Sequence, residues 1–489
     1  MIKIIKENQK GQAFPLEYAI IVLVIISLIG SWTAVAFGGG VSKSEVESSL
    51  KDTRETIIES IGKEVTRTDM IDFLSGKSWN EARTVVQDAG IEVPTKAGIE
   101  VPEGPLKIGS QYFMSGAAGL YGDMAKKGIQ IAVDEINANG GILGREIDVV
   151  FRDEAEGPLK NFRDLVNKEG CKLLMGVDSS GDALNLKPII EDELKVPCII
   201  THAATPRLFA WEKSKYTFGI RMNEEPVVNA ACKMIAKMED VNKVAFVGPD
   251  YSYGWDTYAL YEAYLNKYAP GVEVLDPIYK PLGKTDFTAE IDKLKAEKPD
   301  VIASNIWGAQ LPAFLKQSKQ QGLWDVIDYH FNNMLTGHWE LLTDEMVPEQ
   351  GELWGSGRYV YNWPPHDVHP LNDRFVEKFR NRYDTRPPYV AATGYTALYA
   401  YKEAIERAAA NLGEWPSSEQ IAHYLEGLAV PGPMGPVHLR AKDHQGVYTA
   451  VWEQIVKEEE GEQPSGTNLQ VFPAGEAYPA PLETALEKK

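Results

Sequence analysis

From residue 106 onward, short runs of β-branched and aromatic residues alternate with longer segments in which apolar residues recur at helical spacing. This alternation is typical of a parallel sheet whose strands are connected by crossover helices. The first repeat, residues 106–153, predicts a strand, a glycine-rich loop, a helix, a Gly-Gly turn and a second strand. We therefore expect an α/β fold in which loops at the carboxyl ends of strands hold a ligand.

Five predicted strands lead into loops that share hydroxyl groups, small residues and aromatic rings. The strand and loop pairs are LKIGSQYF/MSGAAGLYGD, CKLLMGV/DSSGDALN, PCIIT/HAATPRLF, KVAFVG/PDYSYGWD and DVIASNI/WGAQLP. Small residues let a ligand approach backbone amides, and hydroxyls with helix N-terminal amides can hold a carboxylate without a cation. The loops supply these groups through Ser179, Ser180, Ala203, Ala204 and Thr205, and aromatic walls through Tyr121, Tyr251, Tyr253, Trp255 and Trp307.

This chemistry favours a small zwitterion or amide over a nucleotide, but each residue also has a purely structural interpretation. A serine before a helix is often an N-cap, which applies to Ser179. A tyrosine or tryptophan near a strand end is often part of the core. The recurrence of the pattern in five loops is what favours a binding cleft. We interpret His202, in the third loop, as a wall or structural residue and not as a catalytic base.

The chain also contains a candidate membrane segment near its beginning. Residues 16–37 are almost wholly apolar and long enough to span a bilayer as a helix. Lysines within residues 1–15 predict that this end lies in the cytoplasm and the rest outside. Residues 38–105 are charged and helix-like at first and then punctuated by proline and glycine, which predicts a stalk and linker. Cleavage at the small-residue motif of residues 34–36 is an alternative.

The stretch KGQAFPLEYAIIVLVI resembles the type IV pilin-like (class III) leader and helix. The resemblance implies that Gly11 ends the leader, that the mature chain starts at or just after Gln12, and that Glu17 is the glutamate at the head of the helix. Five residues separate Gly11 from Glu17, where the family usually has four. Such a helix would permit a homo-oligomer or filament, and a plain uncleaved anchor is the alternative.

Composition and motifs exclude several function classes. A formal net charge of −20 argues against nucleic-acid binding, which needs a basic patch. No phosphate-binding, zinc-protease or nucleophile-elbow motif occurs, so we predict no enzyme activity, no cofactor and no metal site. The acidic run at residues 153–156 is interpreted as strand-end capping and solvation. The three cysteines, Cys171, Cys198 and Cys232, are expected to be small buried residues.

Several stretches occur in a fixed order along the body of the chain: SGAAGLYGD, AVDEINANGGILGREIDVVFRDE, PCIITHAAT, DYSYGWD, KTDFTAEIDKLKAEKPDVI and GPVHLRAKDHQG. Together they resemble the Leu/Ile/Val-binding type of ABC-transporter substrate-binding proteins. The resemblance implies a two-lobed clamshell of the type I periplasmic-binding-protein fold, each lobe a doubly wound parallel sheet, with three strands crossing between lobes. It implies these bounds: lobe 1, residues 106–248 and 351–446; lobe 2, residues 249–350 and 447–475; and a tail, residues 476–489.

The resemblance also assigns site residues. In the family, hydroxyls and amides of lobe 1 hold the ligand's carboxylate, a role carried over to Ser180, Ala203 and Thr205. Tyr121 and Trp307 occupy aromatic wall positions.

This chain departs from the family's pattern on the other lobe. The family usually supplies an acidic side chain there for the ligand's ammonium group, where this chain has Asn332 and Asn333. Asp178 or Asp250 could compensate, although neither stands at the family's position. The frequent lobe 1 disulfide is also absent, because Ser179 and Ala155 stand near those positions.

The sequence thus predicts an extracytoplasmic, membrane-anchored solute-binding protein. It would capture a small amino-acid-like ligand, a branched-chain amino acid or a relative, for import by an ABC permease. The missing acidic residue leaves open a short amide, a urea-like solute or a carboxylate without an amine. The alternative is a pilin-like subunit of a surface filament that displays the binding domain.

Overall fold

The structure, a computed structural model, describes residues 99–489 apart from 338, 365–367, 459–462 and 489. The predicted N-terminal features lie outside the described residues: the leader with Gly11, Gln12 and Glu17, the apolar helix 16–37 and the stalk up to residue 98. Within the part that is described, no helix is both long and apolar enough to serve as a membrane span.

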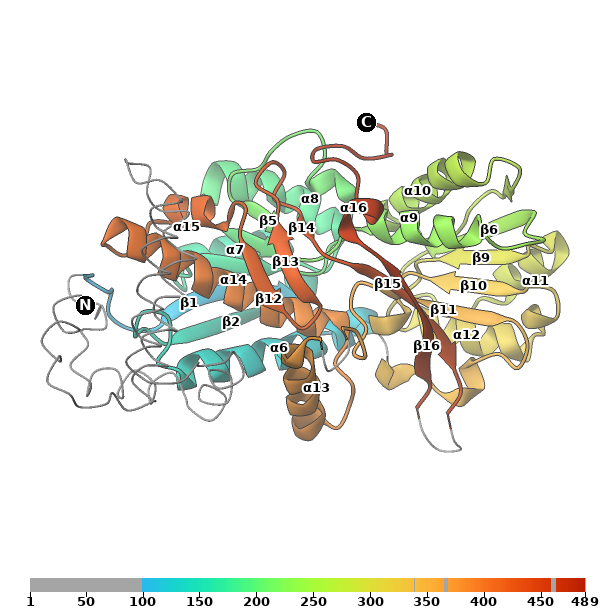
Figure 1. Ribbon diagram of the computed structural model, residues 1–489, viewed down its shortest axis with the longest axis horizontal. Coiled ribbons are helices and arrows are strands. Elements are labelled where there is room, and N and C mark those ends of the chain that lie inside the picture. Colours follow the sequence, from blue (N-terminus) through green and yellow to red (C-terminus); the bar gives the residue numbers. More distant parts are fainter. Residues whose placement is uncertain (1–98, 338, 365–367, 459–462, 489) are drawn as a thin grey trace, which may run out of the picture. The chain divides into compact units, whose positions relative to one another are not determined.

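The first sheet has five parallel strands in the order β2-β1-β3-β4-β5. Its strands are β1 (Leu106–Tyr112), β2 (Ile147–Asp153), β3 (Leu173–Gly176), β4 (Cys198–Ile200) and β5 (Thr217–Gly219). The helices around it are α6 (Gly119–Ala138), α7 (Pro158–Asn167), α8 (Ser180–Pro188) and α14 (Tyr389–Leu412) (Figure 1). The predicted βαβ unit is confirmed: α6 lies between β1 and β2 in the sequence, and the two strands pair in parallel along their whole length.

Helices α6 and α14 pack with their backbones in near contact. A Cβ atom at Gly128 of α6 would lie 2.2 Å from the carbonyl oxygen of Ala391, so no side chain fits there. Tyr121 and Tyr389, each in the first turn of its helix, consequently come together with ring centroids 6.4 Å apart. This packing places two aromatic rings at the edge of the sheet where the strands end.

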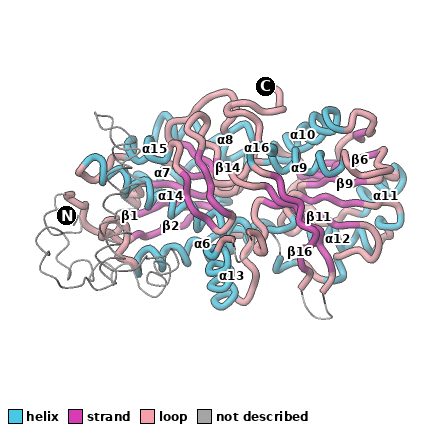
Figure 2. Tube along the Cα trace, in the orientation of Figure 1, coloured by secondary structure: helices cyan, strands magenta, loops and turns pink. Residues whose placement is uncertain are grey.

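The second sheet repeats the same strand order and then adds an antiparallel edge. Strands β7 (Glu273–Val274) and β8 (Ile278–Lys280) both pair with β6 (Lys243–Pro249), which is followed by β9 (Val301–Ser304), β10 (Tyr329–Asn332) and β11 (Glu352–Gly357), all parallel. Strands β15 (Ala450–Val456) and β16 (Ser465–Phe472) are antiparallel to their neighbours. Figure 2 shows the strands of this sheet in magenta, with β6, β9, β11 and β16 labelled. The expected wholly parallel sheet is therefore wrong at this edge, because β15 enters from the other lobe and not through a βαβ crossover.

The chain passes between the two sheets three times. The first passage runs from β5 to α9 (Glu224–Ile235), the second leaves β11 for α13 (Pro370–Tyr383), and the third runs from β14 (Gly446–Val447) to β15. Strands β6 and β11 both belong to the second sheet, in which β6 pairs with β9 and β11 pairs with β10. Residues 243–248 and 352–357 thus belong with lobe 2, whereas the expected bounds put them in lobe 1, because sequence spacing does not tell which sheet a strand joins.

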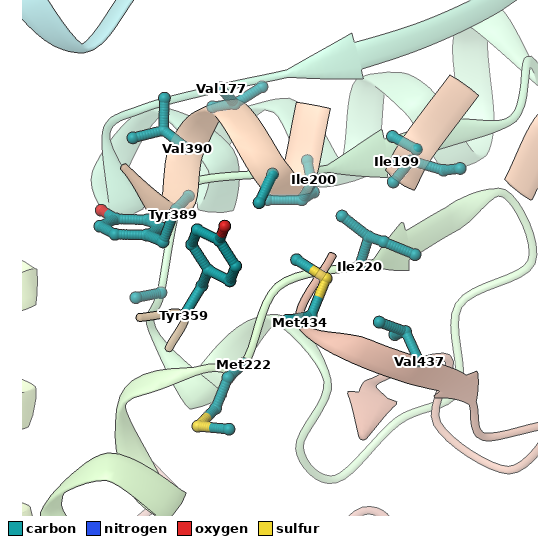
Figure 3. Packing of buried hydrophobic residues seen from close by; sticks show 14 of the residues in the cluster. Val177, Ile199, Ile200, Ile220, Met222, Tyr359, Tyr389, Val390, Met434 and Val437 are labelled. Atoms are coloured by element: carbon teal, nitrogen blue, oxygen red, sulfur yellow. The ribbon is translucent and has the colours of Figure 1, made fainter. Parts of the chain in front are cut away.

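The remaining elements complete the two lobes. Helices α10 (Ser252–Tyr268), α11 (Thr288–Glu297) and α12 (Gln310–Gln320) follow strands of the second sheet. A small sheet of β12 (Ala429–Gly432), β13 (Gly435–Leu439) and β14 follows α15 (Ser418–Leu425). Figure 3 shows part of the larger core, in which Ile199 and Ile200 of β4, Val437 of β13 and Tyr389 of α14 are buried. All three cysteines are buried free thiols.

The last residues, 473–488, form a strap that contacts both lobes and includes α16 (Ala474–Ala477). On lobe 1, the amide of Trp211 donates to the carbonyl of Leu482 over 2.9 Å. On lobe 2, the amide of Ala485 donates to the carboxylate of Glu225 on α9 over 2.6 Å. The tail predicted at 476–489 thus forms hydrogen bonds with both lobes.

Glu453, in the middle of β15, is a buried acid that forms no ion pair within the described part of the chain. Its side chain is fully buried, and neither carboxyl oxygen has a hydrogen-bond partner among the described residues. A Cβ atom at Gly466 on the paired strand β16 would lie 1.7 Å from Glu453 Oε2, so a larger residue there would require the Glu453 carboxyl group to move. Burial raises the pKa of Glu453 to about 8, while the nearby Asn362 side chain and the charge of Arg386 act in the opposite direction.

This pKa predicts a pH dependence of stability. The folded protein keeps the Glu453 proton up to about pH 8, whereas the unfolded chain releases it near about pH 4.3. The stabilising contribution of the protonated group is therefore complete below about pH 4.3 and is lost as the pH rises to about 8. In urea unfolding at pH 5, 6.5 and 8, we expect Glu453→Gln to gain stability relative to the wild type as the pH rises.

A matched control is Glu419→Gln, which changes an acid whose side chain is 67% exposed. It should keep a constant difference from the wild type over the same pH range. Parallel pH profiles for Glu453→Gln and the wild type would contradict the assignment of a protonated Glu453.

Candidate functional site

A small enclosed pocket lies where the strand ends of the two sheets face each other. It is lined from the first lobe by Asp178, Ser180, His202, Ala204 and Arg221, and from the second by Tyr251, Tyr253, Trp307 and Met334. These residues all follow the carboxyl ends of strands, the position at which open α/β sheets hold ligands. The cavity measures about 10 Å³, room for about one water molecule. A larger ligand requires the lobes to part.

Arg221 presents to this pocket a guanidinium group that forms no ion pair with any described residue. Its side chain is 3% exposed, and its Nε and Nη2 atoms have no hydrogen-bond partner in the described part of the chain. The guanidinium carbon lies 5.2 Å from the ring centroid of Tyr389. Burial, together with the charge of Arg358, lowers the pKa of Arg221. Because an arginine nevertheless stays charged in a protein, its unused donors can bind an anionic group.

Aromatic rings form one wall beside the cation. Tyr121 stacks on His202 with ring centroids 4.7 Å apart, and its edge meets Trp307 at 5.2 Å. Trp307 in turn meets His202 nearly perpendicularly at 5.8 Å. Sequence reasoning expected Tyr121 and Trp307 as walls, and the tertiary structure brings them together from different lobes. Such rings can enclose a flat or apolar body.

Asp178 and His202 form a buried pair at the edge of the same wall. The Nδ1 atom of His202 is hydrogen-bonded to Oδ1 of Asp178. The other Asp178 oxygen accepts the amide of Phe113 over 2.7 Å. Beneath them, the carboxylate of Glu154 accepts the amides of Asp178 and Ser179 over 2.7 and 2.8 Å. The acidic run was expected to cap a strand end and to be solvated. Asp153 does cap the end of β2, since it accepts the amide of Ala155 over 3.0 Å, but Glu154 is buried because it accepts the amides of this loop.

In this conformation, the hydroxyls and amides expected to hold a carboxylate form hydrogen bonds within the protein. Ser180 Oγ accepts the amides of Ala204 and Thr205 over 3.2 and 3.3 Å. The amide of Ala203 donates to the carbonyl of Val177 over 2.8 Å. Ser179 is an N-cap whose hydroxyl oxygen accepts the amide of Asp182 over 3.2 Å.

A polar contact across the cleft holds the lobes together. The Thr205 hydroxyl donates to Asp256 Oδ2 over 2.7 Å, and Arg207 Nε donates to Asp256 Oδ1 over 2.8 Å. Asp256 lies on α10 of lobe 2, whereas Thr205 and Arg207 follow β4 of lobe 1. The Thr205 side chain therefore serves closure here and does not line the pocket.

Beneath the pocket, Glu224 accepts hydrogen bonds from several donors. Arg358 Nη2 donates to Glu224 Oε2, and both side chains are fully buried. Asn333 Nδ2 donates to Glu224 Oε1 over 2.6 Å, and the Tyr253 hydroxyl donates to Oε2 over 3.2 Å. Burial alone would lower the pKa of Arg358, but the adjacent Glu224 charge reverses this and raises it. Asn333, expected in the site, faces Glu224 and does not line the pocket.

The predicted residues therefore fall into two groups. The pocket is lined by Asp178, Ser180, Ala204, Tyr251 and Trp307, with Tyr121 stacked behind His202. The others lie nearby in structural roles: Ser179, Ala203, Thr205 and Asn333.

Sequence reasoning missed Arg221 and Met334. Arg221 follows a strand of only three residues, β5, that leads into no glycine-rich loop. The signal in the sequence that could have identified Arg221 was its position, a cationic residue two places after a buried strand. Within the described residues, no group of His, Cys, Asp or Glu side chains is arranged to hold a metal ion.

The Glu224–Arg358 pair predicts a stability effect. Removing one partner of a buried ion pair strands the other charge, at a cost of about 3–5 kcal/mol. In urea unfolding, Arg358→Met should lose about that much stability, and Glu224→Gln/Arg358→Met should recover part of the loss. Arg382→Met is the control: its pair with Asp134 lies on the surface, at 46% and 48% exposure, and should cost about 0–1 kcal/mol. Equal losses for both single variants would contradict the assignment.

Comparison with known proteins agrees with this architecture. A family model described as periplasmic binding protein matches residues 105–459. The Leu/Ile/Val-binding protein of Escherichia coli K12 is 26% identical over 338 residues, which cover 68% of this chain and 86% of that protein.

Solved structures share the fold. A solute-binding protein of an ABC transporter from Rhodopseudomonas palustris BisB5, in complex with 3,4-dihydroxybenzoic acid, has a TM-score of 0.65 at 21% identity and covers 76% of this chain and 98% of its own. A leucine-binding protein from Thermotoga maritima has a TM-score of 0.62 at 21% identity, covering 74% and 98%. With the family model spanning both lobes, the chain belongs to the periplasmic binding protein family.

Proposed function

We propose that this protein captures a small carboxylate with a flat or apolar body and no free ammonium group, and delivers it to an ABC permease. The observation that carries the proposal is the buried Arg221 guanidinium, which lines the pocket and has two nitrogen atoms without a hydrogen-bond partner among the residues that the structure describes. A ligand carboxylate would compensate this charge. Charge-assisted hydrogen bonds of this kind are stronger than bonds between neutral groups.

The acids near the pocket argue against an ammonium group on the ligand. Glu224 already accepts from Arg358, Asn333 and Tyr253. Asn333, which stands where the family usually has an acid, bonds Glu224 and also accepts the Tyr261 hydroxyl over 2.8 Å. A zwitterion would therefore gain its carboxylate contact but find little for its cation.

The walls set the shape of the ligand's body. Trp307 and Tyr251 come from lobe 2, while His202, with Tyr121 stacked on it, comes from lobe 1. A flat ring inserted between the lobes would bury apolar surface on both faces. Because the Thr205 and Arg207 bonds to Asp256 close the cleft, the ligand would enter an open state and stabilise the closed one through contacts made only there. The aromatic acid bound to the Rhodopseudomonas protein supports this ligand class.

A branched-chain amino acid is the second candidate. Asp178 lines the pocket and its carboxylate could receive an ammonium group if His202 gave up its bond. The similarity to the Leu/Ile/Val-binding protein of Escherichia coli supports this second candidate.

We further propose that residues 16–37 anchor the protein to the cell membrane, either as an uncleaved helix or as a pilin-like helix processed near Gln12. The basic residues before the apolar segment support a cytoplasmic N-terminus. Assembly into a filament through this helix is the pilin-like alternative.

Replacing Arg221 tests the ligand class. In the full-length protein purified in detergent, benzoate should raise the melting temperature of the wild type and leucine should not. Arg221→Gln should raise the Kd for benzoate about 10- to 100-fold, since a hydrogen bond to a charged group contributes about 1.5–3 kcal/mol. It should not lower the melting temperature without ligand, because the lost charge is uncompensated.

The matched control is Arg382→Gln, a surface arginine on α13 paired with Asp134. It should leave the benzoate affinity unchanged. A melting shift with leucine, isoleucine or valine but with no carboxylate lacking an amine would favour the second candidate and overturn the first.

Mass spectrometry of the native N-terminus tests the anchor. An intact Met1 is expected for a plain membrane helix, whereas a start at or just after Gln12 is expected for pilin-type processing. Processing at Gln12 together with sheared filaments would favour assembly. A start near Ala36 would mean release of the apolar segment and would overturn anchoring.

A further inference from the structure

His202 enters the pocket with one ring nitrogen already committed. Its side chain is 3% exposed and lines the cavity. The Nδ1 atom is bound to Asp178, a residue that is 4% exposed. A carboxylate accepts hydrogen bonds, so Nδ1 carries the hydrogen of this bond. The nitrogen left for a ligand is therefore Nε2.

The surroundings fix the orientation of this ring. Asp178 is held by the amide of Phe113, and its own amide is held by the buried Glu154. The Tyr121 ring stacks on the imidazole, with the two ring centroids 4.7 Å apart. The Tyr389 ring is tilted against the imidazole, with a centroid distance of 5.5 Å. Turning the ring would break the Asp178 bond within a tightly packed wall. The position of Nε2 is thus set before a ligand arrives.

The charges around the ring favour its neutral form. Burial lowers the pKa of His202; Asp178 acts in the opposite direction, while Arg221 and Arg358 act with burial. A neutral imidazole that donates through Nδ1 has a lone pair on Nε2 and can only accept there. Hence the pocket offers two opposite polarities: donors on Arg221 and an acceptor on His202.

We infer that His202 is a specificity residue that accepts a hydrogen bond from a hydroxyl or N–H group on the body of the ligand, while Arg221 binds its carboxylate. This inference rests on the proposed function and narrows it to carboxylates that carry a second, donating group, such as hydroxybenzoates. Both residues lie against the ring of Tyr389, with Arg221 at 5.2 Å and His202 at 5.5 Å, so one small ligand can reach both. A site built around an acceptor disfavours an analogue without the donor, because the acceptor is then buried unpaired.

The test compares ligands of equal size with and without a donor. Calorimetry on the full-length protein in detergent would measure the affinities of 3- and 4-hydroxybenzoate against 3- and 4-methylbenzoate. For the wild type we expect at least one hydroxy isomer to bind about tenfold more tightly than its methyl counterpart. In His202→Phe, which keeps a flat ring but has no acceptor, this ratio should fall to about one while methylbenzoate binding persists. His423→Phe, an exposed histidine on α15, is the control and should keep the ratio.

The outcomes separate this inference from the proposed function. If no benzoate binds the wild type, the proposed ligand class fails and the inference fails with it. If benzoates bind but neither hydroxy isomer gains over its methyl counterpart, only the role of His202 is overturned. If the wild-type preference is present and His202→Phe retains it, another acceptor reads the hydroxyl and the inference is likewise overturned. Should His202→Phe not fold, the wild-type comparison alone still decides whether a donor is required.

Discussion

The buried ion pair between Glu224 and Arg358 is the interaction on which the arrangement of the cleft depends. Glu224 begins α9 immediately after the first passage between the sheets, and Arg358 follows β11 at the second. The pair thus joins two of the three hinge segments with both charges out of water. Such a pair adds little net stability, but losing either member is costly, so the geometry of the two segments is fixed together.

This pairing also determines the electrostatics of the pocket. Two guanidinium groups, those of Arg221 and Arg358, are buried close to one carboxylate, and Glu224 is bound by Arg358. Arg221, three residues before Glu224, is left with unused donors facing the cavity. Under the proposed function, these unused donors of Arg221 are the feature that would select an anionic ligand.

The side chains that hold the cleft closed differ from those that line the pocket. Asp256 receives Thr205 and Arg207 from the opposite lobe, and the C-terminal strap reaches the same place through the carbonyl of Glu487, which accepts from Arg207 Nη1 over 3.0 Å. Residues expected from the family pattern to hold a carboxylate thus have closing or capping roles in this conformation. A ligand has to compete with, or rearrange, the contacts of Ser180 with the amides of Ala204 and Thr205.

The sequence by itself determined the α/β class, the first βαβ unit and the loops that reach the cleft, because these depend on local periodicity and on short turn signals that adjoin each strand. Tyr121 and Trp307 could be singled out for the same reason. Only the tertiary structure decided which sheet β6 and β11 join, that β15 and β16 run antiparallel, and that Asn333 faces Glu224. It also decided that Glu154 is buried and bonds the amide of Asp178, and that Arg221 forms no ion pair within the described part of the chain. Several of those properties depend on distant partners: Glu154 and Asp178 are 24 residues apart, and Asn333 and Glu224 are 109 apart. The sequence around a charged residue does not show whether a distant residue neutralises it.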